Sequence, residues 1–453
     1  MPSHPHNLNR LFATAIVAVL TLSALAGPGQ SAAHAQSSYT VTDLGVLSGT
    51  TTSRPSALND TALSSTGTPI VRVVGTTVTS KGIAYHAFYW DSATKTITDI
   101  GALTGGQSST PGALNSLGEV VGSGATTSTG GNARAFYWKP ALGAGNLIAL
   151  SQTLSNTLHN GVAATSNATS INEAGIIVGN VYSQAWGLVP VYWQKDPSSG
   201  VYQCIELPGM TAGVISNDGL GAYQINANGD IVGGLPDGIT GGGQIVVWKN
   251  QSINPLTGGA NPANPVYGNP LVSAAADSWG GLINIAGEVA ANYNYPTGGG
   301  FVWAPDGVSS PQDIGHLGFG NTRVHGLSDN GAVTGESWKL SSGVRHAFMW
   351  TTGTGMIDLE TLGGASSYGR SVNNAGIVVG VSQVGGSNGA NQGFRWDSVG
   401  GMRSLNASAL TPTKGSFSLL GFARKISDRG YIVGEGTLSK GGTTHAYLLT
   451  PKP

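Results

Sequence analysis

The chain has 453 residues, a formal net charge of −1, 71 glycines and only 9% charged residues. Hydrophobic residues make up 40% of the chain, which excludes an intrinsically disordered protein, and the balanced charge gives no basic footprint for nucleic acid or an anionic membrane. This composition is typical of many short strands joined by glycine turns. Cys204 is the single cysteine, so no internal disulfide is possible.

The first 35 residues have the pattern of a secretory signal peptide. Arg10 lies in a short polar start, an apolar run covers 11–20, and small residues lead to Ala33-His34-Ala35. We expect cleavage near Ala35, a protein secreted to the periplasm or the extracellular space, and a mature domain spanning 36–453. An uncleaved membrane anchor is the alternative, but the apolar run is shorter than the ~20 residues that a spanning helix needs. No later stretch approaches that length, so we expect no membrane span in the mature chain.

The mature sequence consists of imperfect repeats, of which 345–380 is the clearest copy. An aromatic strand, His346-Ala347-Phe348-Met349-Trp350, precedes a strand ending in Ile357-Asp358-Leu359, and a turn at 373–376 leads into Ile377-Val378-Val379-Gly380. Eight copies of the turn begin at Asn59, Asn115, Asn172, Asn226, Asn284, Ser328, Asn373 and Ser427. Seven aromatic strands end in Trp90, Trp138, Trp193, Trp248, Trp303, Trp350 and Trp396. The period is about fifty residues, which indicates one supersecondary unit per copy.

Each repeated residue type has a structural role that requires no ligand. Asn or Ser, followed three residues later by Gly, fits a hairpin built on a type I turn. The Gly that ends Val-Val-Gly indicates a bulge or the close approach of a neighbouring sheet. The Trp supplies a large apolar surface, and once per unit it is suited to packing between adjacent sheets.

Four strands per unit of this length predict a β-propeller, all-β, with eight four-stranded blades. The last unit lacks one strand, and the mature chain begins with a lone strand at 39–45. We therefore expect the N-terminal strand to complete the last blade, which removes free sheet edges. An open β-solenoid is the competing architecture, but its coils are shorter and it needs distinct caps.

The repeated His-Ala-Phe-x-Trp, Asp-Leu-Gly and Asn-x-x-Gly-x-Val-Val-Gly pattern resembles the HAF family of extracellular repeat proteins. It is seen at His86-Ala87-Phe88-Tyr89-Trp90 and at 346–350, and the resemblance covers 39–451. The family implies an exported repeat protein and leaves its biochemistry open. The third to fifth copies depart from the pattern, with Pro190, Gln244 and Gly299 near the place of the His.

The recurring polar residues are better explained as structural than as catalytic. His86, His346 and His445 stand in separate units, so a local hydrogen bond is favoured over a shared metal site. Repeated acids also cannot all be catalytic, as at Asp43, Asp99, Asp313 and Asp358. A glycosidase pair would have to come from acids outside the repeat: Asp196, Asp237, Asp277 or Glu360. We expect Cys204 to be inert, and we predict no catalytic residue, metal or cofactor.

Three enlarged connections, at 154–168, 208–222 and 254–280, are the candidate recognition loops. The last contains Asn261, Asn264, Tyr267 and Trp279, a mixture suited to a carbohydrate or another polar partner, although neutral loop growth explains it equally. The favoured hypothesis is a secreted, non-enzymatic binding module whose partner, a carbohydrate or a protein, docks on loops of one face. The alternatives are a secreted hydrolase or lyase acting on polysaccharide and a merely structural envelope protein.

Overall fold

A computed structural model describes residues 38–79, 85–127, 132–155, 159–209, 221–236, 243–250, 271–272, 278–294, 298–306, 308–385 and 389–452. Residues 36–453 form one compact unit. The described part contains 34 strands and one short 3-10 turn, Pro140–Leu142. Within these residues no helix has the length and apolar character needed to span a bilayer. The predicted signal peptide and its cleavage site lie outside the described residues.

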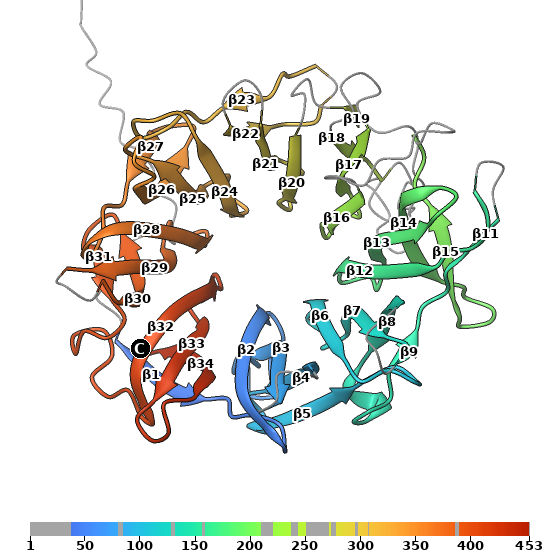
Figure 1. Cartoon of the computed structure of the whole chain (residues 1–453), viewed down its shortest axis with the longest axis horizontal. Coiled ribbons are helices and arrows are strands. Elements are labelled where there is room, and N and C mark those ends of the chain that lie inside the picture. The colour runs from blue at the N-terminus through green and yellow to red at the C-terminus, as the bar shows by residue number, and fades with distance from the viewer. Residues whose placement is uncertain are drawn as a thin grey trace, which may run out of the picture. The chain divides into compact units, whose positions relative to one another are not determined.

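The strands form eight four-stranded antiparallel sheets arranged as a ring, so the predicted β-propeller with eight blades is confirmed (Figure 1). Blades 1 and 2 contain β2 (Thr50–Asn59), β3 (Arg72–Thr79), β4 (Tyr85–Asp91) and β5 (Thr96–Gly101), then β6 (Ser109–Leu114), β7 (Val120–Ala125), β8 (Ala133–Trp138) and β9 (Ile148–Ala149). Blades 3 and 4 contain β12 (Thr165–Ile171), β13 (Ile177–Ser183), β14 (Gly187–Lys195) and β15 (Tyr202–Glu206), then β16 (Gly221–Ile225), β17 (Ile231–Pro236), β18 (Gly243–Trp248) and β19 (Leu271–Val272). A separate hairpin joins β10 (Thr153–Ser155) to β11 (Asn160–Val162).

The other half of the ring has the same construction. Blades 5 and 6 contain β20 (Ser278–Ile283), β21 (Val289–Tyr293), β22 (Gly299–Trp303) and β23 (Gln312–Asp313), then β24 (Thr322–Leu327), β25 (Val333–Trp338), β26 (Arg345–Thr351) and β27 (Gly355–Asp358). Blades 7 and 8 contain β28 (Gly363–Val372), β29 (Val378–Val384), β30 (Asn391–Asp397) and β31 (Gly401–Ser404), then β32 (Phe417–Ile426), β33 (Ile432–Leu438), β34 (Thr444–Pro451) and β1 (Tyr39–Asp43). The first strand of each blade lies innermost, next to the axis of the ring (Figure 1).

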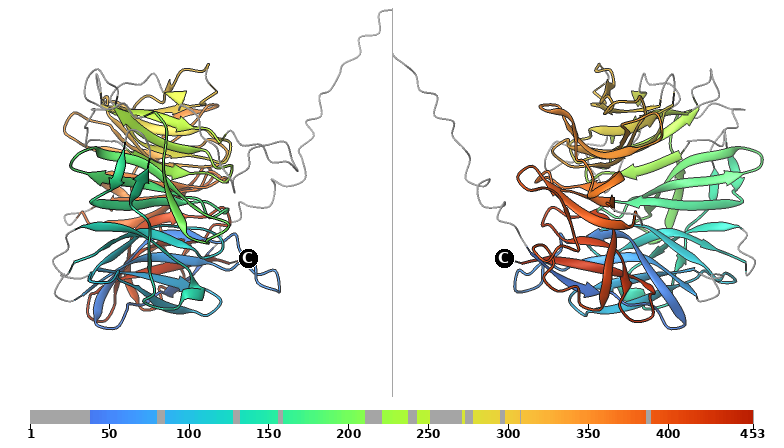
Figure 2. Two further views of the ribbon diagram at one scale, coloured as in Figure 1. Left: turned by 90° about the vertical axis from the view of Figure 1, so that its right-hand side faces the viewer. Right: turned by 60° about the vertical axis from the view of Figure 1, so that its left-hand side comes forward.

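The N-terminal strand closes the ring, as predicted. β1 pairs antiparallel with β34 over five residues, from Tyr39 opposite Pro451 to Asp43 opposite Tyr447. Tyr39 is only 2% exposed and packs in the core between blades 7 and 8. Viewed from the side, the blue first strand lies beside the red strands of the last blade (Figure 2). Because the two ends of the domain share one sheet, opening the ring would break this whole ladder.

The tryptophans pack between blades, which confirms their predicted role. Trp138 shares a cluster with Val74 and Tyr89 of blade 1, and Trp248 shares one with Val178 and Tyr192 of blade 3. All seven are buried: Trp90, Trp138, Trp193, Trp248, Trp303, Trp350 and Trp396. Each indole therefore fills the space against the preceding blade, and one of the eight apolar clusters lies between each pair of adjacent blades.

The Gly of Val-Val-Gly is explained by a β-bulge in the strand beside it. In blade 1 the register shifts between Pro55 and Ala57, and a Cβ on Gly75 would collide with the Arg54 carbonyl. The same shift recurs in all eight innermost strands. Blade 5 has Ala291 in place of this Gly and compensates with two glycines, 280 and 281, on the partner strand. The predicted bulge is therefore present, whereas the close approach comes from the innermost strand of the same sheet and not from a neighbouring sheet.

Candidate functional site

The repeated His and Asp residues form pairs inside single blades. His86 Nδ1 lies 2.9 Å from Asp99 Oδ2, His346 Nδ1 lies 2.9 Å from Asp358 Oδ1, and His445 Nδ1 lies 2.9 Å from Asp43 Oδ1. The third pair links the two ends of the domain. The hydrogen bond that the His86 imidazole donates to the Asp99 carboxylate raises the pKa of His86. These pairs stand in different blades, so they are local supports of strands three and four and not one shared metal site.

Other blades have different polar residues at the position of the His–Asp pair. Asp313 accepts a hydrogen bond from Tyr293 at 2.7 Å, and Ser404 donates to Gln392 in blade 7. In blade 3 the acid is Glu206, and His159 from the β10–β11 hairpin reaches it at 3.0 Å. The fold thus requires a polar pair here, and the identity of the partners varies.

One of these pairs belongs to a cluster with metal-ligand chemistry. Donor atoms of His346, Asp358 and Glu360 lie within 4.8 Å of one another. The ammonium of Lys339 already sits among them, 2.7 Å from Asp358 Oδ2 and 3.7 Å from Glu360 Oε2. Burial alone would raise the pKa of Asp358, but the hydrogen bonds from His346 and Lys339 outweigh it and hold this pKa at about 2. The lysine supplies the positive charge that a metal ion would bring, so the cluster is better explained as an ion-pair network.

Two rings of hydrogen bonds join each blade to the next. Near the His–Asp pairs, the backbone N–H that follows the His position donates to a side chain on the next innermost strand. The Ala87 N–H donates to Ser109 at 3.0 Å, and the Ala446 N–H donates to Ser53 at 2.9 Å across the closure. Ser166, Ser278 and Ser367 make the equivalent contact. At two other boundaries the direction is reversed, because the N–H groups of Ala222 and Val324 on innermost strands donate to Asn180 and Asn292 on the second strand of the preceding blade. These side chains are structural staples.

The second ring lies at the opposite ends of the innermost strands, in the predicted Asn-x-x-Gly turns. Each turn or its neighbouring arginine donates to a backbone carbonyl of the next turn around all eight blades. The donors are Arg72, Asn115, Asn172, Asn226, Asn284, Asn330, Asn373 and Arg429. The turns are therefore interlocked, and their side chains are engaged in holding the ring.

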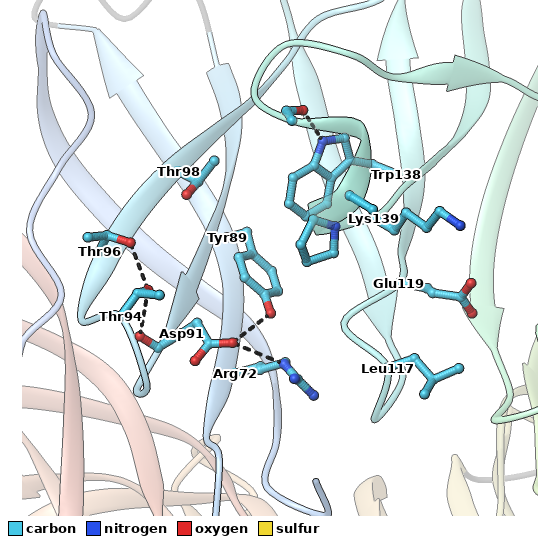
Figure 3. A pocket seen from close by; sticks show the side chains of 13 residues that line it. Arg72, Tyr89, Asp91, Thr94, Thr96, Thr98, Leu117, Glu119, Trp138 and Lys139 are labelled. Carbon is cyan, nitrogen blue, oxygen red and sulfur yellow. Dashed lines mark hydrogen bonds and ion pairs between the residues drawn. The ribbon is translucent and has the colours of Figure 1, made fainter. Parts of the chain in front are cut away.

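A cavity of about 540 Å³ opens between blades 1 and 2, near the turns (Figure 3). Most of its charged groups already have partners, and Lys139 is the exception among the described lining residues. Arg72 Nε lies 3.2 Å from Asp91 Oδ2, and the Tyr89 hydroxyl donates to the same carboxylate at 3.0 Å. Glu119 accepts from Tyr137 at 2.5 Å, and Trp138 is buried. The cavity therefore offers few free groups for recognising a ligand.

The charged residues of the innermost strands are distributed unevenly around the ring. The eight strands carry five Arg and Lys residues and no Asp or Glu. We call the five residues the axial cationic arc: Arg54, Arg323, Arg370, Arg424 and Lys425. All belong to blades 6, 7, 8 and 1, which are neighbours in the ring (Figure 1). In a chain with net charge −1, this is a concentrated positive region.

Two buried carboxylates on the second strands balance part of this charge. Glu435 lies 3.3 Å from Arg54 Nε and also pairs with Arg424. Glu336 pairs with His325 and lies 3.6 Å from Arg345 Nη1. Arg345 and Arg323 lie on Trp338, at 4.0 and 5.6 Å from its ring centre. The arc is thus held in place by acids behind it and by an aromatic platform.

Three members of the arc keep their charge available. Among the described residues, no carboxylate lies within 4 Å of Arg323, Arg370 or Lys425. Lys425 is accessible to water, yet it is closely surrounded by protein, and this desolvation lowers its pKa. An anion bound beside Lys425 would offset that cost, because it would favour the charged ammonium.

The carboxylates proposed for a glycosidase pair are not brought together where they are described. Asp196 follows β14 in blade 3 and caps a turn, where the Ser198 hydroxyl lowers its pKa to about 2. Glu360 follows β27 in blade 6. Asp237 and Asp277 lie outside the described residues, as do Asn261, Asn264, Tyr267 and most of the connections 208–222 and 254–280. The connection 154–168 is largely described and contains the β10–β11 hairpin and the start of β12, and Trp279 lies in strand β20 and not in a loop. Cys204 is half-buried, and burial raises its pKa to about 12, which agrees with an inert thiol.

Sequence reasoning missed the arc and the staples. The staples could have been found, because Ser53, Ser109 and Ser367 recur nine or ten residues after the Asp of the His–Asp pair. The arc has no such signal, since equivalent positions in the other blades hold unrelated residues.

No family model matches the chain, and no curated protein matches it. Solved structures share the fold at low identity. The Dos1 propeller is 10% identical with a TM-score of 0.49, covering 91% of this chain and 95% of its own. A puromycin-hydrolyzing peptidase from Mycobacterium tuberculosis is 13% identical with a TM-score of 0.44, covering 89% and 59%. TolB from Acinetobacter baumannii is 11% identical with a TM-score of 0.36, covering 63% and 62%. The likeness extends to the propeller fold and no further.

Proposed function

We propose that the chain is an exported, non-enzymatic binding module and that its ligand is anionic and docks on the axial cationic arc. The observation that carries this proposal is the concentration of five cations and no carboxylate on the innermost strands. Export follows from the signal-peptide pattern at 1–35 and from the resemblance to HAF repeats. The enlarged loops remain a possible second contact region for the same ligand.

The fold itself does not require these charges. Blades 2 to 5 have the same bulge and the same turn, yet they carry Thr110, Asn167 and Trp279 where blades 1 and 6 carry Arg54 and Arg323. Like charges close together repel and destabilise the folded state. Charges that destabilise the fold and are not needed for its structure favour a role in binding. Guanidinium groups are suited to binding carboxylate, sulfate and phosphate.

A polyanion panel tests this proposal. The wild-type protein is passed over immobilised polygalacturonate, dextran sulfate, polyglutamate and polyphosphate, with neutral dextran as the blank. We expect salt-sensitive retention on at least one polyanion and none on dextran. The triple variant Arg323→Gln, Arg370→Gln, Lys425→Gln should lose retention while its thermal unfolding stays within a few degrees of wild type.

A matched control removes the same charge elsewhere. Lys95, Lys195 and Lys440 are exposed and lie off the innermost strands, so Lys95→Gln, Lys195→Gln, Lys440→Gln should still be retained. Equal losses in both triple variants would show that net charge alone matters and would contradict a site at the arc.

A polysaccharide hydrolase or lyase is the second candidate, and one observation favours it. His325 lies on β24 with Arg323, and its partner Glu336 lies on the adjacent strand β25. A titratable pair therefore stands near a guanidinium that could neutralise a sugar carboxylate. Incubation with polyuronate, followed by assays for new reducing ends and for the ultraviolet absorbance of an unsaturated sugar, tests it. Product formation that disappears in His325→Gln would replace the non-enzymatic proposal.

A further inference from the structure

The recurring bulge defines two equivalent positions in every innermost strand. The bulge position holds Ser56, Gly112, Thr169, Tyr223, Gly281, His325, Arg370 and Arg424. The pre-bulge position, two residues earlier, holds Arg54, Thr110, Asn167, Gly221, Trp279, Arg323, Tyr368 and Phe422. Apart from Gly221 and Gly281, which are buried, the residues at these positions are half-buried or exposed. They lie on the strands next to the axis (Figure 1), although Tyr223 packs against the core between blades 4 and 5 and the Thr169 hydroxyl donates to the Ala222 carbonyl of blade 4.

The chemistry of these sixteen positions is restricted. They hold cationic, aromatic and small polar residues with glycine, and they hold no aliphatic side chain and no carboxylate. The alternating buried positions in the same strands, by contrast, hold residues such as Val324 and Ala423. A site for an apolar peptide would also need aliphatic anchor residues, which these positions lack, so this selection points to a ligand with both charge and many hydroxyls.

Aromatic side chains interleave with the cations. Arg370 lies 5.7 Å from the ring centre of Tyr368 in the same strand, and Arg424 lies 5.9 Å from that of Phe422. Trp279 of blade 5 is half-buried and donates its indole N–H to Asn294 at 3.2 Å, which fixes the ring. A half-exposed aromatic face beside a guanidinium suits the flat apolar face of a pyranose that carries a carboxylate.

The innermost strands of blades 1 to 3 also carry hydrogen-bonding groups of the kind that bind sugar hydroxyls. Thr110 and Asn167 supply hydroxyl and amide donors and acceptors, whereas the Ser56 and Thr169 hydroxyls donate to backbone carbonyls and supply acceptors. From this combination we infer that the ligand of the axial site is an acidic saccharide, a chain of uronate-type sugars. Arginines bind its carboxylates, the aromatic rings contact its sugar faces, and the hydroxyl and amide groups bind its hydroxyls. This inference rests on the proposed anion-binding function and names its ligand class.

Calorimetric titration with matched oligomers distinguishes the acidic-saccharide inference from the more general anion-binding proposal. The probes are oligogalacturonate, the same oligomer with its carboxyl groups reduced to alcohols, oligoglutamate of equal charge, and oligothymidylate. An oligomer of mannuronate and guluronate extends the uronate probes. We expect a uronate oligomer to bind at least about tenfold more tightly than oligoglutamate or oligothymidylate, and the reduced oligomer to lose binding by a similar factor.

Variants of Tyr368 test separately whether an aromatic ring contacts the sugar. Tyr368→Leu should weaken uronate binding about tenfold, whereas Tyr368→Phe keeps the ring and should bind as wild type does. Neither change should alter retention on dextran sulfate by more than about twofold, since that contact is electrostatic. A thermal unfolding scan of each variant confirms that it is folded.

The outcomes distinguish failure of the inference from failure of the proposed function. If oligoglutamate or oligothymidylate binds as tightly as the uronates, the anion site stands and the ligand is a protein or a nucleic acid. If reduction of the carboxyl groups leaves binding unchanged, the saccharide is neutral and the cations are not its contacts. If no anion binds at all, both proposals are wrong.

Discussion

Blades 6, 7, 8 and 1 and blades 2 to 5 share one backbone design but differ in what they present to the axis. Both halves have the bulge, the interlocked turns and the indole wedges. The axial cationic arc occurs in the first half only, while the second presents neutral polar, aromatic and glycine residues.

The comparison separates structural from functional residues without a ligand. A residue type that recurs at one position in most blades stabilises the shared backbone structure of the propeller, which we call the frame. Trp and the stapling Ser are examples. A residue type confined to adjacent blades, at a position where the frame tolerates Thr, Asn, Gly or Trp, serves something outside the frame. By this criterion the recurrent His–Asp pairs are structural, and Arg323 and Arg370 are the residues that we propose to bind the ligand.

Breaking the frame that both halves share should have the largest effect. Tyr39→Ala removes a buried aromatic ring from the closing strand, and we expect a loss of about 3–5 kcal/mol in the free energy of unfolding. Chemical denaturation measures it. Thr40→Ala in the same strand is exposed and should cost less than about 0.5 kcal/mol. Similar losses in the two variants would show that β1 is not packed as described.

A Cβ beside the bulge should cost the same in either half. Gly179→Ala and Gly335→Ala both place a methyl against a carbonyl oxygen of the bulged strand, and each should destabilise by about 2–3 kcal/mol. Only Gly335→Ala displaces Arg323, so only this variant should also weaken polyanion retention. Loss of retention in Gly179→Ala would mean that the two halves are not independent in binding.

Removing the acid behind the arc should sharpen the difference between the halves. Glu435→Gln leaves Arg54 and Arg424 without their carboxylate, which costs about 1–2 kcal/mol because both arginines are partly exposed. The same change makes the arc more positive, so anion binding should become severalfold tighter. Stability from denaturation and affinity from titration should therefore move in opposite directions. Weaker binding would indicate that Glu435 positions the arginines.

The smallest effect concerns the His–Asp pairs. The pKa of Asp358 is depressed to about 2, so its contribution to stability is fully present above the unfolded value of 3.8 and is lost as pH falls through 2. Asp358→Asn should cost about 1 kcal/mol at pH 7 and nearly nothing at pH 2. Denaturation curves at the two pH values test this, and a cost that persists in acid would assign the role of Asp358 to packing. Polyanion retention should not change.

The sequence was sufficient for the frame and insufficient for the site. Blade number, closure by 39–45, the Trp wedge and the Gly beside the bulge could all be predicted, because each repeats with a fixed physical cause. The predicted glycosidase acids were chosen only for lying outside the repeat, and Asp196 proved to cap a turn. Arg54, Arg323 and Arg370 escaped notice because a bulge shifts the alternation of a strand, so the pattern of neighbouring residues does not show which side chains face the axis.

The most direct test of the anion site uses the wild-type protein and Lys425 as the reporter. Because desolvation lowers its pKa, Lys425 should be acylated by limiting acetic anhydride faster than Lys95, Lys195 and Lys440, as read by mass spectrometry of peptides. Saturating polygalacturonate or dextran sulfate should protect Lys425 and leave the other three unchanged. Labelling of Lys425 at the same rate with and without both polyanions would contradict an anion site on the axial cationic arc.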